Sequence, residues 1–257
     1  MELSIVFKTI LENWHIVLLF FSIAILYSSV GFGGGSSYLA VLALTSIAFT
    51  QIRATALLCN IIVVTGNVLI FKKQKQYNWT KVVPLVIFSI PLAFLGGYLR
   101  IEQTFFFVLL GFTLFFASIT MWVSKINVST EGDSRELKLP QNALYGGSIG
   151  FISGMVGIGG GIFLAPLLHL TNWETPKKIA AAASLFILVN SISGLIGQFT
   201  NPTLSINWNL TSILLIIVFI GGQIGNRLSN KLLTPIQLKK ATAILIALVS
   251  LRILLNI

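Results

Sequence analysis

The chain has 257 residues, of which 55% are hydrophobic and 9% are charged, and its mean hydropathy is +0.92. Because an ordinary soluble domain carries about 25% charged residues, this composition excludes a soluble globular protein and predicts an integral membrane protein. The net charge of +10 does not indicate nucleic-acid binding, since Lys and Arg lie in short connections between apolar runs, where membrane orientation explains them.

Eight apolar runs follow one another along the chain, and they are continuous rather than alternating. Continuous runs predict transmembrane helices instead of barrel strands, so the expected fold is an all-α polytopic membrane protein. The runs cover residues 14–49, 54–71, 82–99, 105–123, 143–170, 179–199, 210–224 and 241–255. The first and fifth runs are the longest, but roughly 30 residues are too few for two full crossings of about 20 residues each.

Both long runs contain a dense group of glycines. In the fifth run, Gly157, Gly159, Gly160 and Gly161 are followed by Pro166. Each Gly costs a helix about 1 kcal/mol relative to Ala, so this group should break a membrane helix. Broken backbone at membrane depth is tolerated only where it is buried in protein or lines a cavity. The pattern therefore predicts a functional break.

The same glycine pattern occurs in the first long run, and further matches follow it at a nearly constant offset. The matched pairs are Gly31 with Gly157, Gly33 with Gly159, Gly34 with Gly160, Gly35 with Gly161, Gly66 with Gly194, Phe71 with Phe199 and Gly97 with Gly225. Internal duplication is typical of secondary transporters. We therefore predict a first transmembrane repeat over 1–123, a polar cytoplasmic linker over 124–141 and a second transmembrane repeat over 142–257. Each repeat is a glycine-rich broken or re-entrant helix followed by three transmembrane helices.

The distribution of basic residues bears on how the long runs cross the membrane. Each long run is either a long broken helix or a re-entrant hairpin that enters and returns. With hairpins, the basic connections 72–81, 124–141, 171–178 and 225–240 all face one side, which the positive-inside rule favours. Each half then has five elements, so the two repeats are inverted and both termini lie outside.

Helix breaks of this kind favour an anion site. A restarting helix presents free N–H groups and the positive end of its dipole, and glycine lets a ligand approach the backbone closely. Neutral polar side chains in the second and sixth runs would complete such a site. The predicted substrate-binding residues are Gly33, Gly34, Gly35, Ser36, Thr55, Asn60, Gly159, Gly160, Gly161, Ser184 and Asn190. Helix packing through small and polar residues is the alternative interpretation.

Acidic residues are missing from the interior of every apolar run. Cation carriers and proton relays usually hold a buried carboxylate, so this absence argues against both, and it leaves no acid pair for hydrolysis. His15 and His169 lie at run ends without a second ligand spaced for a metal. The sequence predicts no enzyme, and it indicates no catalytic residue, metal or cofactor.

Three basic residues precede the second and sixth runs in corresponding places. They are Arg53, Lys177 and Lys178. These residues could draw an anion toward the pore mouth, but anchoring at the membrane interface is the simpler interpretation.

Two motifs support a family resemblance. The pattern G-x-G-G-G-x-x-x-x-P-x-L is present as Gly157, Gly159, Gly160, Gly161, Pro166 and Leu168. An A-T-S-like helix start follows each long run, at Ala54-Thr55 and Ala183-Ser184. With its duplicated pattern of runs, the chain resembles the TauE/SafE family of sulfite exporter-like permeases over nearly its whole length. It departs from that family at Ala40, where the first motif lacks the proline, and in keeping only one hydroxyl at each helix start.

The resemblance implies a permease of the cell (inner) membrane for a small sulfur-containing anion such as sulfite, sulfoacetate or thiosulfate. Export is the expected direction, because an anion moving outward runs with a negative-inside potential. The expected partners are this anion and the lipid bilayer, without nucleic acid, and a homo-oligomer stays open. An accessory or assembly subunit without transport of its own and an anion channel are the alternatives.

Overall fold

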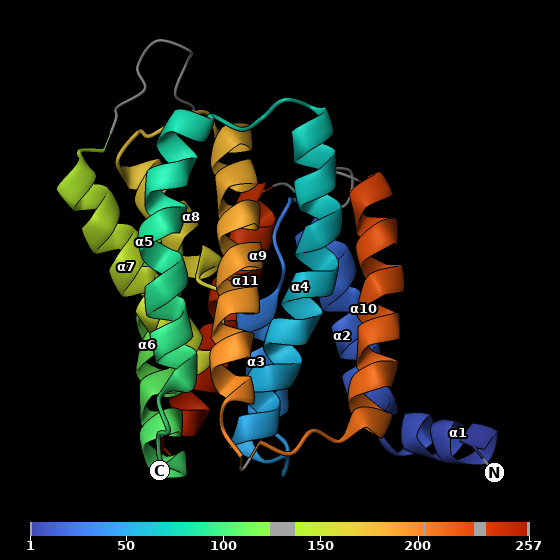
Figure 1. Ribbon diagram of the computed structural model, residues 1–257. Coiled ribbons are helices and arrows are strands. Elements are labelled where there is room, and N and C mark those ends of the chain that lie inside the picture. Colours follow the sequence, from blue (N-terminus) through green and yellow to red (C-terminus); the bar gives the residue numbers. More distant parts are fainter. Residues whose placement is uncertain (1, 124–136, 203, 229–234, 256–257) are drawn as a thin grey trace.

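The computed structural model describes residues 2–123, 137–202, 204–228 and 235–255, and all regular structure within them is helical (Figure 1). In chain order the helices are α1 (Glu2–Glu12), α2 (Trp14–Ser29), α3 (Gly35–Ala43), α4 (Phe49–Lys73), α5 (Trp79–Tyr98), α6 (Gln103–Val123), α7 (Leu139–Val156), α8 (Gly161–Leu170), α9 (Pro176–Phe199), α10 (Trp208–Leu228) and α11 (Pro235–Leu255). Each ordinary apolar run forms one helix, and each long run forms two. Most of the predicted linker 124–141 lies outside the described residues, and its last residues already belong to α7.

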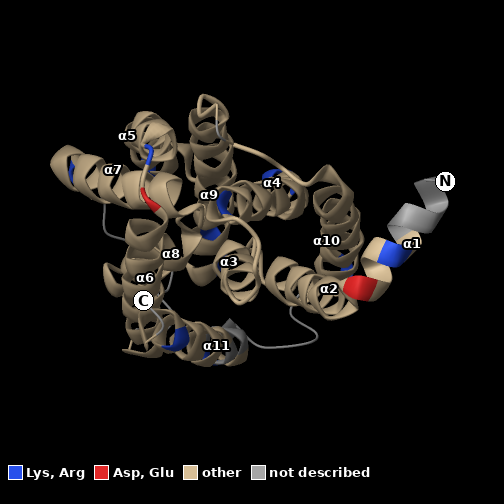
Figure 2. Ribbon diagram, turned by 90° about the horizontal axis from the view of Figure 1, so that it is seen from below, with Lys and Arg blue, Asp and Glu red and all other residues tan. Residues whose placement is uncertain are grey.

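The outer surface of the bundle is apolar. Among the described helices, α4, α5, α6, α9 and α10 are each long and apolar enough to cross a membrane. Large side chains such as Leu18, Phe116, Leu144 and Phe219 are exposed on the outside. Viewed along the bundle, most of the ribbon carries no charged residue (Figure 2). A surface of this kind is stable in lipid rather than in water, so the predicted all-helical, multi-pass membrane protein is confirmed.

Both long runs are interrupted at their glycines. Between α2 and α3, Gly31 and Gly34 have φ of 89° and 88°, and between α7 and α8, Gly157, Gly159 and Gly160 have φ from 83° to 90°. Only glycine adopts this left-handed backbone without strain. The two interruptions, residues 30–34 and 157–160, are called break one and break two below.

The chain changes direction at each break. In Figure 1, α3 returns toward the side from which α2 rises, and α8 returns toward the side from which α7 descends, so the two turns point into the bundle from opposite sides. The two ends of the chain lie on the same side (Figure 1). With about 1.5 Å of rise per residue, the 16-residue α2 spans about 24 Å, which is less than a hydrocarbon core of about 30 Å.

Glycines bring helices from distant parts of the chain into close contact. Helix α7 packs along α5, and α10 packs along α2. A Cβ at Gly150 would lie 2.6 Å from the Ser89 carbonyl, and a Cβ at Gly221 would lie 2.9 Å from the Phe21 carbonyl. Small residues at one-turn spacing allow this approach of two backbones. The central helices α4 and α9 pack on each other and hold α3 and α8 against them.

Candidate functional site

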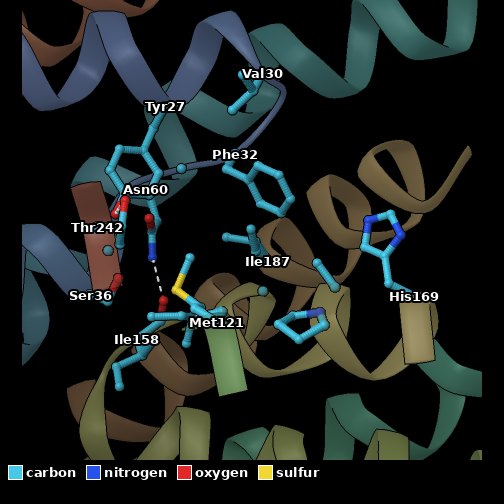
Figure 3. Close-up of a pocket in the computed structure, with 17 residues that line it drawn as sticks. Tyr27, Val30, Phe32, Ser36, Asn60, Met121, Ile158, His169, Ile187 and Thr242 are labelled. Atoms are coloured by element: carbon cyan, nitrogen blue, oxygen red, sulfur yellow. Dashed lines mark hydrogen bonds between the residues drawn. The ribbon is translucent and has the colours of Figure 1, made fainter. Parts of the chain in front are cut away.

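The two breaks meet at a cavity of about 100 Å³, called the inner cavity. Its lining residues come from both breaks and from six helices besides α3. They are Tyr27, Val30, Phe32, Gly33, Gly34, Gly35, Ser36, Asn60, Met121, Ile158, Gly161, Ile162, Ala165, Pro166, His169, Ile187 and Thr242. Figure 3 shows the labelled side chains gathered around this space. A cavity of this size holds several water molecules or one small ion.

The N-termini of α3 and α8 both contribute to the inner cavity. Helix α3 begins at Gly35 after Gly34, helix α8 begins at Gly161 after Gly160, and neither start has a hydrogen bond from a capping side chain. The first N–H groups of a helix have no partner within that helix. Each N-terminus carries about +0.5 elementary charge, so the two together present nearly one positive charge to the cavity.

Asn60 lies between the two breaks. Its side chain is fully buried in α4, and Nδ2 donates a 3.0 Å hydrogen bond to the carbonyl of Ile158 in break two. A Cβ at Gly33 would lie 2.5 Å from Asn60 Oδ1, and a Cβ at Gly159 would lie 2.7 Å from Asn60 Nδ2. Oδ1 accepts no hydrogen bond from the described residues. Asn60 therefore connects the two breaks, and glycine on either side leaves room for it.

Two carbonyl groups of break one already have side-chain donors. The Ser184 hydroxyl donates to the Gly31 carbonyl, and Asn67 Nδ2 donates to the Phe32 carbonyl at 3.1 Å. Because these acceptors are occupied while the helix N-termini are uncapped, the backbone around the inner cavity offers donors more than acceptors. This arrangement suits an anion better than a cation.

Arg53 binds the end of α7, next to break two. Its Nη2 donates to the Gly154 carbonyl in the last turn of α7 at 3.3 Å, where a cation stabilises the negative end of the helix dipole. Only 4% of Arg53 is exposed, so the interpretation as an interfacial anchor is wrong. Among the described residues, no Asp or Glu lies within 4.0 Å of its guanidinium. Its charge therefore adds to the positive potential near the breaks.

The residues predicted from sequence to bind substrate divide into two groups. Those that line the inner cavity are Gly33, Gly34, Gly35, Ser36, Asn60 and Gly161. Those outside its lining are Thr55, Gly159, Gly160, Ser184 and Asn190. Of the second group, Gly159 and Gly160 belong to break two, and the other three residues have polar side chains on α4 and α9.

The polar side chains of the second group are engaged by other parts of the protein. Thr55 pairs with Thr211 of α10 at 3.3 Å, and Asn190 Nδ2 donates to the Phe186 carbonyl of its own helix at 2.8 Å. Ser184 holds break one. None of these three side chains belongs to the wall of the inner cavity.

Several lining residues had no signal in the sequence analysis. The Tyr27 hydroxyl lies 2.7 Å from Ser37 Oγ and donates to Thr242 Oγ1 at 2.8 Å, which joins α2, α3 and α11. His169 also lines the inner cavity, although its place at a run end suggested an interfacial residue. Met121 and Thr242 come from the last helix of each half, where nothing polar stood out. In the described part of the chain, no group of three or more His, Cys, Asp and Glu could hold a metal ion.

A bundle of membrane helices with a cavity where two broken helices meet is typical of membrane transporters. The chain belongs to the TauE/SafE family, since the sequence model of the family described as Sulfite exporter TauE/SafE matches residues 16–253. This family consists of membrane transporters and not of enzymes.

Relatives of the chain carry transporter names as well. The "Probable membrane transporter protein y4hK" of Sinorhizobium fredii is 33% identical over 249 residues, which cover 95% of this chain and 98% of that protein. The "Probable membrane transporter protein YunE" of Bacillus subtilis is 25% identical over 199 residues, which cover 70% and 72% of the two chains. No solved structure matches the chain.

Proposed function

We propose that the protein is a secondary transporter that binds one small oxyanion in the inner cavity. The observation that carries this proposal is the convergence of two uncapped helix N-termini on Asn60. N–H groups, the Asn60 amide and the Ser36 hydroxyl would hold the anion without a permanent counter-charge in the cavity wall, so that it can be released again. The substrate-binding role of Gly33–Gly35, Ser36 and Gly161 rests on this geometry.

The helix packing supports two inverted repeats, 1–123 and 142–257. Exchanging the halves exchanges α2 with α7 and α5 with α10, and the contacts of α2 with α10 then correspond to those of α7 with α5. Contacts of α3 with α4 likewise correspond to those of α8 with α9. Breaks that enter from opposite sides agree with this inversion. Transport would proceed as one repeat rocks against the other and exposes the inner cavity alternately to each side.

The charges give an orientation for the protein in the cell (inner) membrane. The connections 72–81 and 171–178 lie on the side opposite the two termini, and their Lys residues indicate the cytoplasm. An anion that leaves the cell gains about 2.3 kcal/mol per charge per 100 mV, so export needs no coupling ion. The family description points to sulfite, and we propose a sulfur oxyanion or an organosulfonate as the exported anion.

Reconstitution separates this function from its alternatives. Purified protein in liposomes should give saturable efflux of sulfite and should exchange internal for external sulfite. An accessory subunit would give no flux, and a channel would give flux without saturation or exchange. Either result would overturn the proposal of a carrier.

A further inference from the structure

A second, larger cavity adjoins the inner cavity. Its volume is about 310 Å³, and we call it the outer cavity. It shares Val30, Phe32 and His169 with the inner cavity, so the two are separated by little more than these side chains. Gln74 and Lys177 line its other end and are exposed, which places that end at the surface of the basic connections.

The outer cavity has the chemistry of an anion site. None of its lining residues is acidic; they are Ser28, Ser29, Val30, Gly31, Phe32, Asn67, Ile70, Phe71, Gln74, His169, Pro176, Lys177, Ala180 and Asn226. Lys177 supplies a full positive charge. The amide nitrogen of Asn226 is buried and donates to none of the described residues. A Cβ at Gly66 would lie 2.7 Å from this nitrogen, so glycine at that position leaves room for the amide.

Phe32 stands between the two cavities. In Figure 3 its ring lies between two groups of side chains, with Tyr27 and Asn60 on one side and His169 on the other. The backbone beside it is fixed, because Asn67 Nδ2 donates to the Phe32 carbonyl at 3.1 Å and Ser184 donates to the carbonyl of Gly31. Rotation of the ring would widen the passage while these two bonds hold break one in place.

We infer that the outer cavity is a second anion site, through which a small oxyanion reaches the inner cavity from the face of the basic connections. This inference rests on the proposed transport function. Lys177 attracts the anion, the Asn226 amide donates a hydrogen bond to it, and the Phe32 ring closes the passage behind it. Lys177 and Asn226 thus determine the affinity for substrate on this face, while Asn60 and the breaks hold the anion farther in.

The first test compares two lysine variants in liposomes with sulfite as the probe. Lys177→Gln should raise KM about fivefold at low salt, and high salt should remove the difference, because screening weakens a surface charge. Lys73→Gln removes an exposed charge nearby that does not line the outer cavity, and it should leave KM near that of the unchanged protein. Equal KM values for both variants and the unchanged protein would overturn the access site.

Binding to the purified protein in detergent tests the same site without flux. The binding curve for sulfite should have two steps, a stronger one for the inner cavity and a weaker one for the outer cavity. Lys177→Gln or Asn226→Leu should remove only the weaker step. A single step that neither substitution changes would overturn the inference. Two normal steps without any flux would instead contradict the proposed transport function and leave the second site standing.

Phe32→Ala tests the passage between the cavities. Loss of the ring should raise the flux of sulfite and weaken its saturation, while the stronger binding step persists. Unchanged flux and saturation in folded Phe32→Ala protein would show that the ring does not separate the two sites.

Discussion

Asn60 Nδ2 donates a 3.0 Å hydrogen bond to the Ile158 carbonyl, and this bond joins α4 to the break between α7 and α8. The same amide faces Gly33 of break one and Gly35 at the start of α3. One buried side chain thus fixes the distance between the two breaks.

Replacing Asn60 should weaken both the fold and the site. Asn60→Ala leaves the buried Ile158 carbonyl without a donor, which costs about 1–3 kcal/mol of unfolding free energy, and it removes an amide from the inner cavity. Thermal unfolding and sulfite efflux measure the two effects. Asn190→Ala is the matched control, since this amide is equally buried but binds its own helix. Equal loss of flux in both variants would contradict the proposal that the inner cavity binds the transported anion.

Side chains at the break glycines should abolish flux without preventing membrane insertion. Gly34→Ala places a residue with a Cβ at φ 88°, 2.8 Å from Ile23 Cγ2, and Gly160→Ala does the same at φ 84°, 2.8 Å from Phe186 Cε1. The left-handed backbone costs about 1–2 kcal/mol at each position.

A helical glycine provides the control for these variants. A Cβ at Gly222 would find only ordinary contacts, 3.7 Å or more away, so Gly222→Ala should retain flux. Insertion is followed by membrane fractionation and flux by efflux of sulfite. Normal flux in Gly34→Ala and Gly160→Ala would remove the breaks from the mechanism.

A buried ion pair fastens the loop between α8 and α9 to α5. Lys81 Nζ lies 3.4 Å from Glu174 Oε1, with only 6% and 7% of the two side chains exposed, and it also donates to the Trp173 carbonyl at 3.1 Å. Glu174→Gln leaves the Lys81 charge buried and unpaired, so it should cost about 3 kcal/mol. Glu12→Gln breaks the exposed Lys8–Glu12 pair and should leave the unfolding temperature unchanged. Similar unfolding temperatures for the two variants would contradict this role.

The same pair predicts how stability depends on pH. Burial alone would raise the pKa of Glu174, but the hydrogen bond from Asn78 and the charges of Lys81 and Lys178 outweigh it and hold the pKa below its ordinary value. The stability from Glu174 is therefore present above the unfolded-state pKa and is lost as pH falls through the lower, folded-state pKa. Unfolding temperatures of the unchanged protein and Glu174→Gln should converge in acid. A constant difference down to that pH would contradict the assignment.

Close packing of α7 on α5 should not tolerate a side chain. Gly150→Val would place a branched side chain against the Ser89 backbone, where even a Cβ would lie 2.6 Å from the carbonyl, so folded protein should not accumulate. Gly147→Ala meets only the end of the Leu92 side chain and should be tolerated. Size-exclusion chromatography after solubilisation measures both outcomes, and a normal monodisperse peak for Gly150→Val would contradict the packing described.

The sequence predicted the helices well because continuous apolar runs have few alternatives in a membrane. It also located the breaks, since glycines at 31, 34, 157, 159 and 160 occupy positions that need positive φ. It was harder to predict which polar residues line the inner cavity. Ser184 and Asn190 both lie on the central helix α9, but Ser184 donates to the Gly31 carbonyl and Asn190 to the Phe186 carbonyl of its own helix, and neither lines the inner cavity.

The burial of Arg53 and the place of Thr242 in the cavity wall could not be predicted from the sequence, because both depend on contacts between distant segments. Arg53 is buried only because the end of α7 packs over α4, where Gly157 has no side chain to keep them apart. Thr242 reaches the inner cavity because α11 packs against α3 and brings it to Tyr27. A single polar residue in an apolar run gives no sign of such a partner.

The position of a bound anion tests the central claim most directly. Selenite resembles sulfite in shape and charge, and its selenium can be located by anomalous scattering in crystals of the protein. The account predicts selenium in the inner cavity, within hydrogen-bonding distance of Asn60 and of the N–H groups that begin α3 and α8. Selenium bound elsewhere while the inner cavity stays empty would contradict it.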